Sequence, residues 1–234
     1  MNAKRFYLAA SLLLVPTLGW GRSRSDLRSD VRLLTKDTGV SRVRFSNAQI
    51  NDLLNEAQRI AAARSYCVHH STTFYLAAGT TYYATKTDFV SVRRLTRDWL
   101  ELKELTPAAL DSKSRGWAES AGQPTYYFVN FSSRNLIGFS PFPGVAADTA
   151  TIRMDYYALP SNMATDSAEA FGAINELLPY NQILPYYAAA VLSGVEGETA
   201  VAQLYFAMFE AGIKTMTERC VDRPNYNPSL VGRP

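Results

Sequence analysis

The sequence is poor in the residues and motifs on which enzymatic chemistry usually depends. It contains two histidines and two cysteines among 234 residues. His69 and His70 are adjacent and close to Cys67, so a zinc site would need two further ligands that the spacing does not supply. No glycine-rich phosphate loop, HExxH helix or GxSxG elbow occurs. We therefore expect no enzymatic activity, no cofactor, and no catalytic, cofactor-binding or metal-binding residues.

Cysteine is too scarce to define a disulfide framework. Cys67 and Cys220 each lie at the end of a predicted helix. We expect two free, buried thiols rather than a bridge.

The excess of positive over negative charge is also small, because the formal net charge is +3. This value alone does not argue for a nucleic-acid-binding protein, which usually shows a clustered basic face. The basic residues do concentrate near the N-terminus, where they outnumber Asp26, Asp30 and Asp37. The pattern predicts a solvated face with acid–base pairs at helical spacing. The basic residues of this stretch are Arg22, Arg24, Arg28, Arg32, Lys36, Arg42 and Arg44.

No apolar run is long enough for a convincing transmembrane helix. Residues 6–21, FYLAASLLLVPTLGWG, follow Lys4 and Arg5 and have the charged and apolar regions of a secretory signal. Pro16 interrupts the run, and the segment after it lacks a clean pattern of small residues for cleavage. A cleaved signal peptide and a retained N-terminal arm both fit residues 1–22.

The strongest local signal is a helix between Phe45 and Tyr66. Ser46 and Gln49 have the spacing of a capping box, and Phe45 and Ile50 have that of a hydrophobic staple. Apolar residues recur at spacings of three and four and predict one buried stripe. The stripe consists of Ile50, Leu53, Leu54, Ala57, Ile60 and Ala61.

Three more helices are predicted, one before this helix and two near the C-terminus. Ser25 is expected to cap a short helix through Leu34. An almost wholly apolar helix over 185–192 should be buried on most sides, and the segment 171–178 is at most a short helical piece. The longest helix spans 198–220, with Leu204 and Met208 among its expected core residues. Its predicted apolar face consists of Val201, Leu204, Tyr205, Met208, Phe209, Gly212 and Met216. Proline then ends helical structure, and residues 222–234 are expected to be an extended tail.

The middle of the chain has the composition of a β module. Residues 72–83 suggest two short strands around a turn, and further strands are expected over 88–95, 100–105, 126–131, 136–139 and 151–157. The fold class is therefore α+β, with a helical bundle core built from both chain ends (23–70 and 171–221) and an inserted antiparallel β module (71–160).

This order of segments resembles a known family. The run LRSDVRLLTKDTGVSRVRFSNAQINDLLNEAQRIAA, then Trp117, GQPTYYF, IGFSPFPG and IRMDYYALP, then an apolar helix, a long helix and a tail, resembles the head-to-tail adaptor (connector, or neck) proteins of tailed bacteriophages. The likeness covers nearly the whole chain from about Thr17. The apolar first twenty residues depart from it.

The resemblance implies a ring-forming structural protein in the neck of the virion, between capsid and tail. Its partners would be further copies of itself, twelve if it follows the portal, the portal protein, a tail or nozzle protein, and the genomic DNA, contacted without sequence specificity. No membrane would be involved. The C-terminal tail would dock to the portal through Pro224, Tyr226, Pro228, Leu230 and Val231.

The main alternative is an exported binding module whose aromatic β part recognises a glycan or a protein after its signal is removed. A disulfide between Cys67 and Cys220 and cleavage near Gly21 would favour this alternative. Reduced thiols and a large symmetric assembly would favour the adaptor. A second alternative concerns only the tail, which would be a frayed terminus without a partner.

Overall fold

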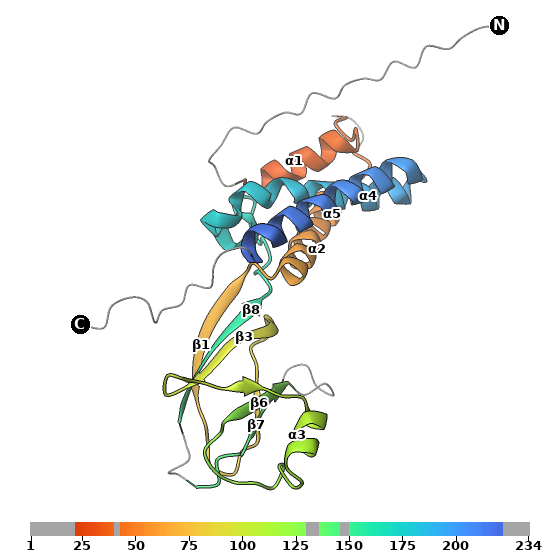
Figure 1. Ribbon diagram of the computed structural model, residues 1–234. Coiled ribbons are helices and arrows are strands. Elements are labelled where there is room, and N and C mark those ends of the chain that lie inside the picture. The colour runs from red at the N-terminus through yellow and green to blue at the C-terminus, as the bar shows by residue number, and fades with distance from the viewer. Residues whose placement is uncertain (1–21, 40–42, 130–135, 146–149, 222–234) are drawn as a thin grey trace, which may run out of the picture.

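The computed structural model describes residues 22–39, 43–129, 136–145 and 150–221. The molecule is elongated, with helices at one end and strands at the other (Figure 1). Helices from both chain ends pack together and two small sheets come between them in the sequence, which confirms the predicted α+β class. In chain order the elements are α1 (Arg24–Leu34), α2 (Asn47–Ser65), β1 (His69–Tyr75), β2 (Tyr82–Ala84), β3 (Phe89–Arg97), β4 (Leu100–Glu101), β5 (Lys103–Glu104), α3 (Pro107–Lys113), β6 (Tyr126–Val129), β7 (Leu136–Ser140), β8 (Thr151–Ala158), η2 (Ala170–Ala173), η3 (Asn175–Ile183), α4 (Leu184–Val195) and α5 (Thr199–Val221).

The start of α2 is as the sequence predicts. The Ser46 hydroxyl accepts the Gln49 N–H at 3.2 Å, and the Gln49 side chain accepts the Ser46 N–H at 2.9 Å, which completes the capping box. Ile50 and Leu54 are fully buried, whereas Leu53 and Ile60 are half-buried against the same core. These four residues therefore do line the helical core.

The start of α1 differs from the prediction by two residues. Ser23, not Ser25, is the N-cap, because the Asp26 side chain lies three positions after it and accepts its N–H at 3.0 Å. The Ser23 hydroxyl accepts the Asp26 N–H in return. This is a second capping box, with aspartate in the place of glutamate.

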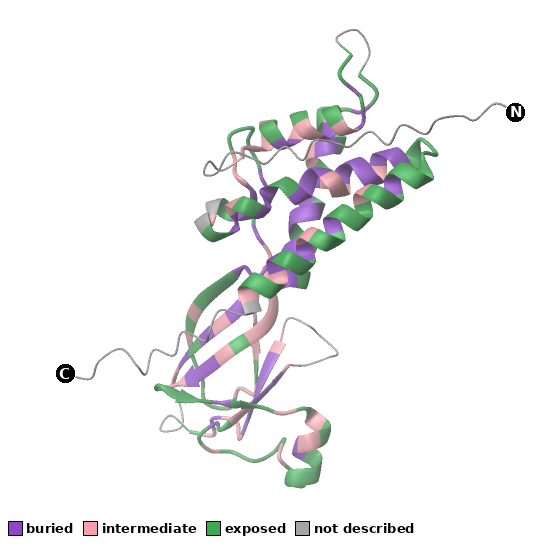
Figure 2. Ribbon diagram, turned by 45° about the horizontal axis from the view of Figure 1, so that its top comes forward, coloured by how far each residue is buried: buried purple, intermediate pink, exposed green. Residues whose placement is uncertain are grey.

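Helix α4 is the centre of the helical core, and α1, α2 and α5 all pack on it. Its alanines 188 to 190 are fully buried, as expected for a helix that is apolar on most sides. Figure 2 shows α4 buried along most of its length and α5 exposed along much of its outer side. Before α4, two 3-10 helices, η2 and η3, replace the short helical piece expected over 171–178.

The predicted core face of α5 is right for Phe209 and Met216 and wrong for Leu204 and Met208. Leu204 and Met208 are 59% and 38% exposed, and the buried face lies roughly a third of a turn away. The error has a physical cause, since α5 is apolar on two of its faces and the pattern alone does not say which one meets α4. The buried face consists of Ala202, Phe209, Ile213 and Met216.

The β module contains two four-stranded sheets, with strand orders β1-β8-β3-β4 and β2-β7-β6-β5. The strand expected over 100–105 is divided at Leu102, where the chain leaves the first sheet and joins the second. The two strands expected over 72–83 exist as β1 and β2, but they lie in different sheets. Pairing is antiparallel except between β5 and β6, which are parallel and connected through α3.

Strand β8 links the sheets to the helices. Its residues alternate in burial, with Ile152, Met154, Tyr156 and Ala158 facing the core, because successive side chains of a strand point to opposite faces. Buried residues of the sheets and of the helices form one continuous hydrophobic cluster. Where the chain enters and leaves the β module, the Ala158 N–H donates to the Val68 carbonyl at 2.9 Å.

Candidate interaction surfaces

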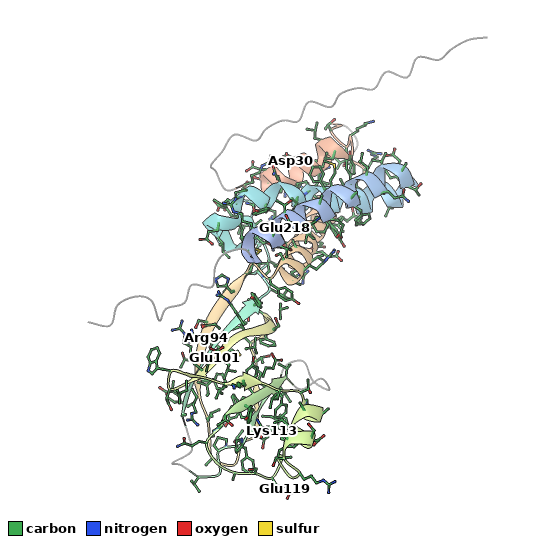
Figure 3. The ribbon with its side chains drawn as sticks, viewed as in Figure 1. Asp30, Arg94, Glu101, Lys113, Glu119 and Glu218 are labelled. Atoms are coloured by element: carbon green, nitrogen blue, oxygen red, sulfur yellow. A yellow bond between two sulfur atoms is a disulfide. The ribbon has the colours of Figure 1, made fainter. Side chains whose placement is uncertain are left out.

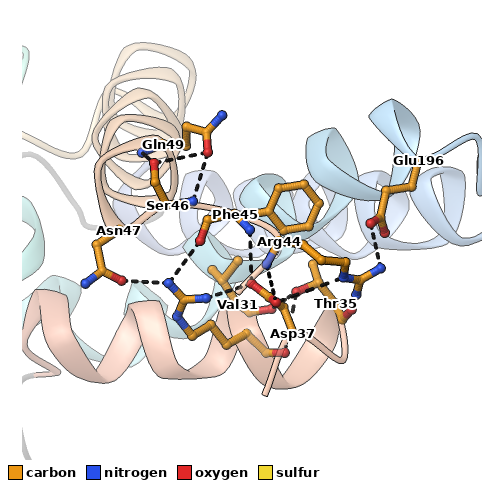
Figure 4. Close-up of polar contacts among 10 residues, drawn as sticks. Val31, Thr35, Asp37, Arg44, Phe45, Ser46, Asn47, Gln49 and Glu196 are labelled. Atoms are coloured by element: carbon orange, nitrogen blue, oxygen red, sulfur yellow. Dashed lines mark hydrogen bonds and ion pairs between the residues drawn. The ribbon is translucent and has the colours of Figure 1, made fainter. Parts of the chain in front are cut away.

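A buried carboxylate organises the connection between α1 and α2. Asp37 accepts the Arg44 N–H at 2.8 Å and pairs with the Arg32 guanidinium at 2.6 Å (Figure 4). Burial alone would raise the pKa of the Asp37 carboxyl, but the N–H groups of Arg44 and Phe45 and the nearby guanidinium charges together lower it. Arg44 also reaches Glu196 at 2.5 Å. The α1–α2 connection is thereby tied to the end of α4.

The arginines of α1 are committed to contacts within the molecule. Arg24 and Arg28 both pair with Asp166, which follows the β module, at 2.8 and 3.0 Å. Hydrogen bonds from Arg28 and Arg24 lower the pKa of the Asp166 carboxyl to about 2. The prediction of pairs at helical spacing is wrong for these residues. Their partner lies about 140 positions away in the sequence, which no local pattern indicates.

Two buried amides of α2 hold the chain that returns from the β module. The Asn55 side-chain oxygen accepts the Met163 N–H at 2.8 Å, and the Gln58 side chain bonds the Phe171 N–H and the Ser161 carbonyl. Neither amide belongs to the apolar stripe predicted for this helix, and yet both are buried. A polar residue with a buried partner has the same local pattern as a solvated one, so only the tertiary structure distinguishes them.

Cys67 and Cys220 form a disulfide, and the prediction of two free thiols is wrong. Their Cα atoms lie 5.5 Å apart. Cys67 follows α2 and Cys220 is in the last turn of α5, so packing of the two helices brings their C-terminal ends together. The bridge fixes the position from which residues 222–234 continue.

The end of the first sheet that lies away from the helices exposes large aromatic side chains. Trp99 is 87% exposed and lies with Asp98 in the two-residue turn between β3 and β4. Both residues have positive φ, 44° and 74°, in a turn that usually contains asparagine and glycine. Leu100 and Tyr75 are also exposed, and Arg94 approaches Glu101 across the hairpin at 3.9 Å (Figure 3). A side chain this exposed contributes little to the packing of the core.

The sequence reading did not identify this turn. The Asp-Trp pair is not a recognised hairpin signal, and the run 100–105 was read as a separate strand. The alternation of apolar and polar residues stops at Arg97 and starts again at Leu100. This gap of two residues is a signal from which a hairpin turn could have been predicted.

The two histidines do not contribute to a metal site in the described part of the chain. No group of three or more histidine, cysteine, aspartate or glutamate residues there could hold a metal ion. His70 instead contacts Asp88 at 2.9 Å, and Asp88 also accepts the Tyr156 hydroxyl at 3.1 Å. Burial and this hydrogen bond raise the pKa of Tyr156 to about 12.

No helix among the described residues is long and apolar enough to cross a membrane.

Comparison with known protein families identifies the family to which this chain belongs. The family model described as SU10 adaptor protein matches residues 22–232, almost the whole chain. The chain belongs to the SU10 adaptor family. The comparison with curated proteins found no match.

SU10 adaptors are phage head-to-tail adaptors, so this protein is a structural component of the virion and not an enzyme. Its partners are among the virion proteins. The assignment confirms the predicted adaptor and favours it over the exported binding module. The disulfide does not conflict with this assignment, because a virion released from its host meets the oxidising conditions in which disulfides persist.

The candidate docking residues of the C-terminal tail lie outside the described residues. They are Pro224, Tyr226, Pro228, Leu230 and Val231. The family match nevertheless extends to residue 232, so this SU10 adaptor shares most of that segment with its family. The match begins at residue 22 and does not include residues 1–21.

Proposed function

We propose that this SU10 adaptor forms a ring, of twelve copies if it follows the portal, in the virion neck. The ring joins the portal to the tail and surrounds the DNA that passes between them. One observation supports the proposal most directly. The molecule is divided into a helical core, whose helices are connected by ion pairs and a disulfide, and a β module with an exposed aromatic turn. One part suits contacts between copies, and the other suits contact with the next component.

The helical core is suited to pack laterally against the helical cores of neighbouring copies around a channel. The disulfide joins the C-terminal ends of α2 and α5, the Asp37 and Arg44 contacts tie the α1–α2 connection to the end of α4, and Asp166 holds α1, which favours a rigid core. Contact with DNA needs no sequence readout, because a channel that DNA must leave gains nothing from tight binding. The small net charge and the paired arginines of α1 agree with weak contact.

The β module offers its exposed turn to the tail or nozzle protein. Trp99 is the natural anchor, because a tryptophan that enters a pocket of a partner is among the commonest hot spots of protein interfaces.

The C-terminal tail, 222–234, docks to the portal. It starts next to the disulfide and contains three prolines.

A pair of variants tests both ends of this proposal. A chain ending at Val221 should keep its fold, which circular dichroism and thermal melting would verify, and should lose co-purification with its portal. Trp99→Ser should keep portal binding and lose binding to the tail or nozzle protein. Normal portal binding by the shortened chain would refute the role of the tail. Failure of the unaltered chain to bind any portal or to form rings would refute the proposed function.

A further inference from the structure

Strand β1 lies at the edge of its sheet, and its outer side pairs with no other strand among the described residues. The strand order β1-β8-β3-β4 leaves β1 paired on one side only. With seven residues it is the longest edge strand of the β module, because β2, β4 and β5 have three, two and two. Its residues are exposed except Thr72 and Phe74, which are half-buried.

The hydrogen bonds that flank β1 show which of its backbone groups are free. The Ala158 N–H donates to the Val68 carbonyl at 2.9 Å, and the Leu76 N–H donates to the Ala150 carbonyl at 3.0 Å. Successive residues of a strand direct their backbone groups to opposite sides, so the even-numbered residues of β1 bond to β8. The odd-numbered residues direct their N–H and C=O groups away from β8, and no other described segment bonds to these groups. These residues are His69, Ser71, Thr73 and Tyr75.

This edge has none of the features that usually prevent strand pairing. The sequence of β1, HHSTTFY, contains no proline and no lysine, arginine, aspartate or glutamate. Its pairing with β8 continues through seven residues without a bulge. A regular, uncharged edge of this kind is a template for a further strand. We therefore looked for a segment that could cover it.

The C-terminal tail starts next to this edge. Cys220 is bonded to Cys67, two positions before β1, and their Cα atoms are 5.5 Å apart. Neighbouring strands of a sheet are about 4.8 Å apart, so the tail begins about one strand spacing from the chain that becomes β1. Figure 1 shows the end of α5 at the start of β1. The 13 residues of 222–234 are more than the seven that would cover β1.

The prolines of the tail have the spacing that a strand with a single partner requires. Pro224, Pro228 and Pro234 all occupy even-numbered positions. In a strand the three missing N–H groups would therefore all lie on one side, where no partner needs them. The odd-numbered residues of 225–231 keep their N–H groups for the other side. No residue from 224 to 232 is charged, which matches the uncharged edge of β1.

We infer that residues 225–231 pair with the outer side of β1 of the same chain, in the parallel direction. The direction follows from the disulfide, which places the beginning of the tail at the beginning of β1. Parallel pairing also occurs between β5 and β6 of this β module. The side chains of Tyr226 and Leu230 then share a face of the sheet with Tyr75, which is 76% exposed. The inference concerns the chain before it meets a portal, so it does not depend on the proposed ring.

Amide hydrogen exchange measured by NMR tests this pairing within a single strand. The N–H groups of Ser71 and Thr73 should exchange about tenfold faster or more in a chain ending at Val221, because their bonds to the tail are lost. The N–H groups of Thr72 and Phe74, which face β8, should exchange at the same rate in both chains and serve as the control. Equal exchange of Ser71 and Thr73 in the two chains would overturn the inference.

Two proline substitutions test which side of the tail faces β1. Ser229→Pro removes an N–H group that faces β1, so it should accelerate the exchange of Ser71 and Thr73 about as truncation does. Leu230→Pro removes an N–H group that faces away from β1 and should leave their exchange unchanged. If the two substitutions had the same effect, the pairing would be wrong.

The remaining outcomes separate pairing within one chain from pairing between copies, and both from the proposed function. Exchange of Ser71 and Thr73 should not depend on protein concentration. Protection that disappeared on dilution would mean that another copy covers β1, and would overturn the inference. A chain whose β1 edge was protected but which bound no portal would refute the proposed function and leave this pairing in place.

Discussion

Cys67 and Cys220 are bonded to each other across 153 positions of the sequence. One residue ends the connection from α2 to the β module, and the other lies in the last turn of the last helix. The bond therefore closes a loop that contains the β module, η2, η3, α4 and most of α5. It joins the two parts of the helical core that the β module separates in the sequence.

Reduction of this disulfide should destabilise the protein. Loss of a bridge that closes so long a loop costs about 2–5 kcal/mol in small proteins, chiefly because the unfolded chain gains freedom. Urea unfolding with and without a phosphine reductant would measure the change. A Cys67→Ala, Cys220→Ala double variant should match the reduced protein and should not respond to reductant. An intact mass that shows two free thiols in the untreated protein would contradict the bridge.

Leu54→Asp should prevent folding of the helical core. Leu54 is fully buried, and an unpaired charge at such a position costs about 4 kcal/mol or more. Ala48→Asp is the matched control, because it places the same charge on an exposed position in the first turn of α2, where an acidic group is favourable. Circular dichroism and solubility would distinguish them. A folded, soluble Leu54→Asp protein would show that the buried face of α2 is assigned wrongly.

The accuracy of the sequence predictions depended on how local each signal is. The capping box of α2 and the burial of α4 depend on neighbouring residues alone, and both were predicted. The face of α5 that meets the core was predicted only in part, because two apolar faces compete and only contact with α4 selects one. The disulfide was missed because two cysteines far apart in a sequence show no sign of their distance in space.

Two glycines should respond in opposite directions to alanine. A Cβ atom at Gly212 of α5 would lie 2.5 Å from Ile183 Cγ2, so Gly212→Ala should lower stability by about 1–3 kcal/mol despite its better helix propensity. At Gly194 of α4 the nearest atom would lie at 3.9 Å. Gly194→Ala should therefore be neutral or stabilising by up to about 1 kcal/mol. Thermal melting of the two variants would show whether α5 approaches η3 as closely as described.

Asp166 should make stability depend on acid pH. Its folded pKa, about 2, lies below the ordinary value for aspartate, so its contribution is present above about pH 4. That contribution is lost as the pH falls from about 4 to about 2. The urea midpoint of Asp166→Asn should therefore be below that of the unaltered protein at pH 6, with the difference disappearing near pH 2. A difference in urea midpoint that persisted unchanged down to pH 2 would contradict this contribution of Asp166.

The interaction surfaces were harder to predict than the fold. Trp99 can be recognised as a candidate contact residue only from its exposure and its positive φ. Neither property can be predicted from the residues around it. Leu204 and Met208 were expected in the helical core, but both are exposed, so they contribute little to core packing. Composition shows that a residue is apolar, whereas only the folded chain shows whether it already has a partner.

The hydrogen bond between Ala158 and Val68 has a consequence for how such proteins can diversify. Because the chain leaves the helices and returns to them at adjacent points, the 89 residues between these positions can be replaced as a cassette. A substitute would fit if its two ends lay as close together and its buried residues continued the hydrophobic cluster that the sheets share with the helices. Phages could thus exchange the part that meets a new tail while inheriting an unchanged set of helices.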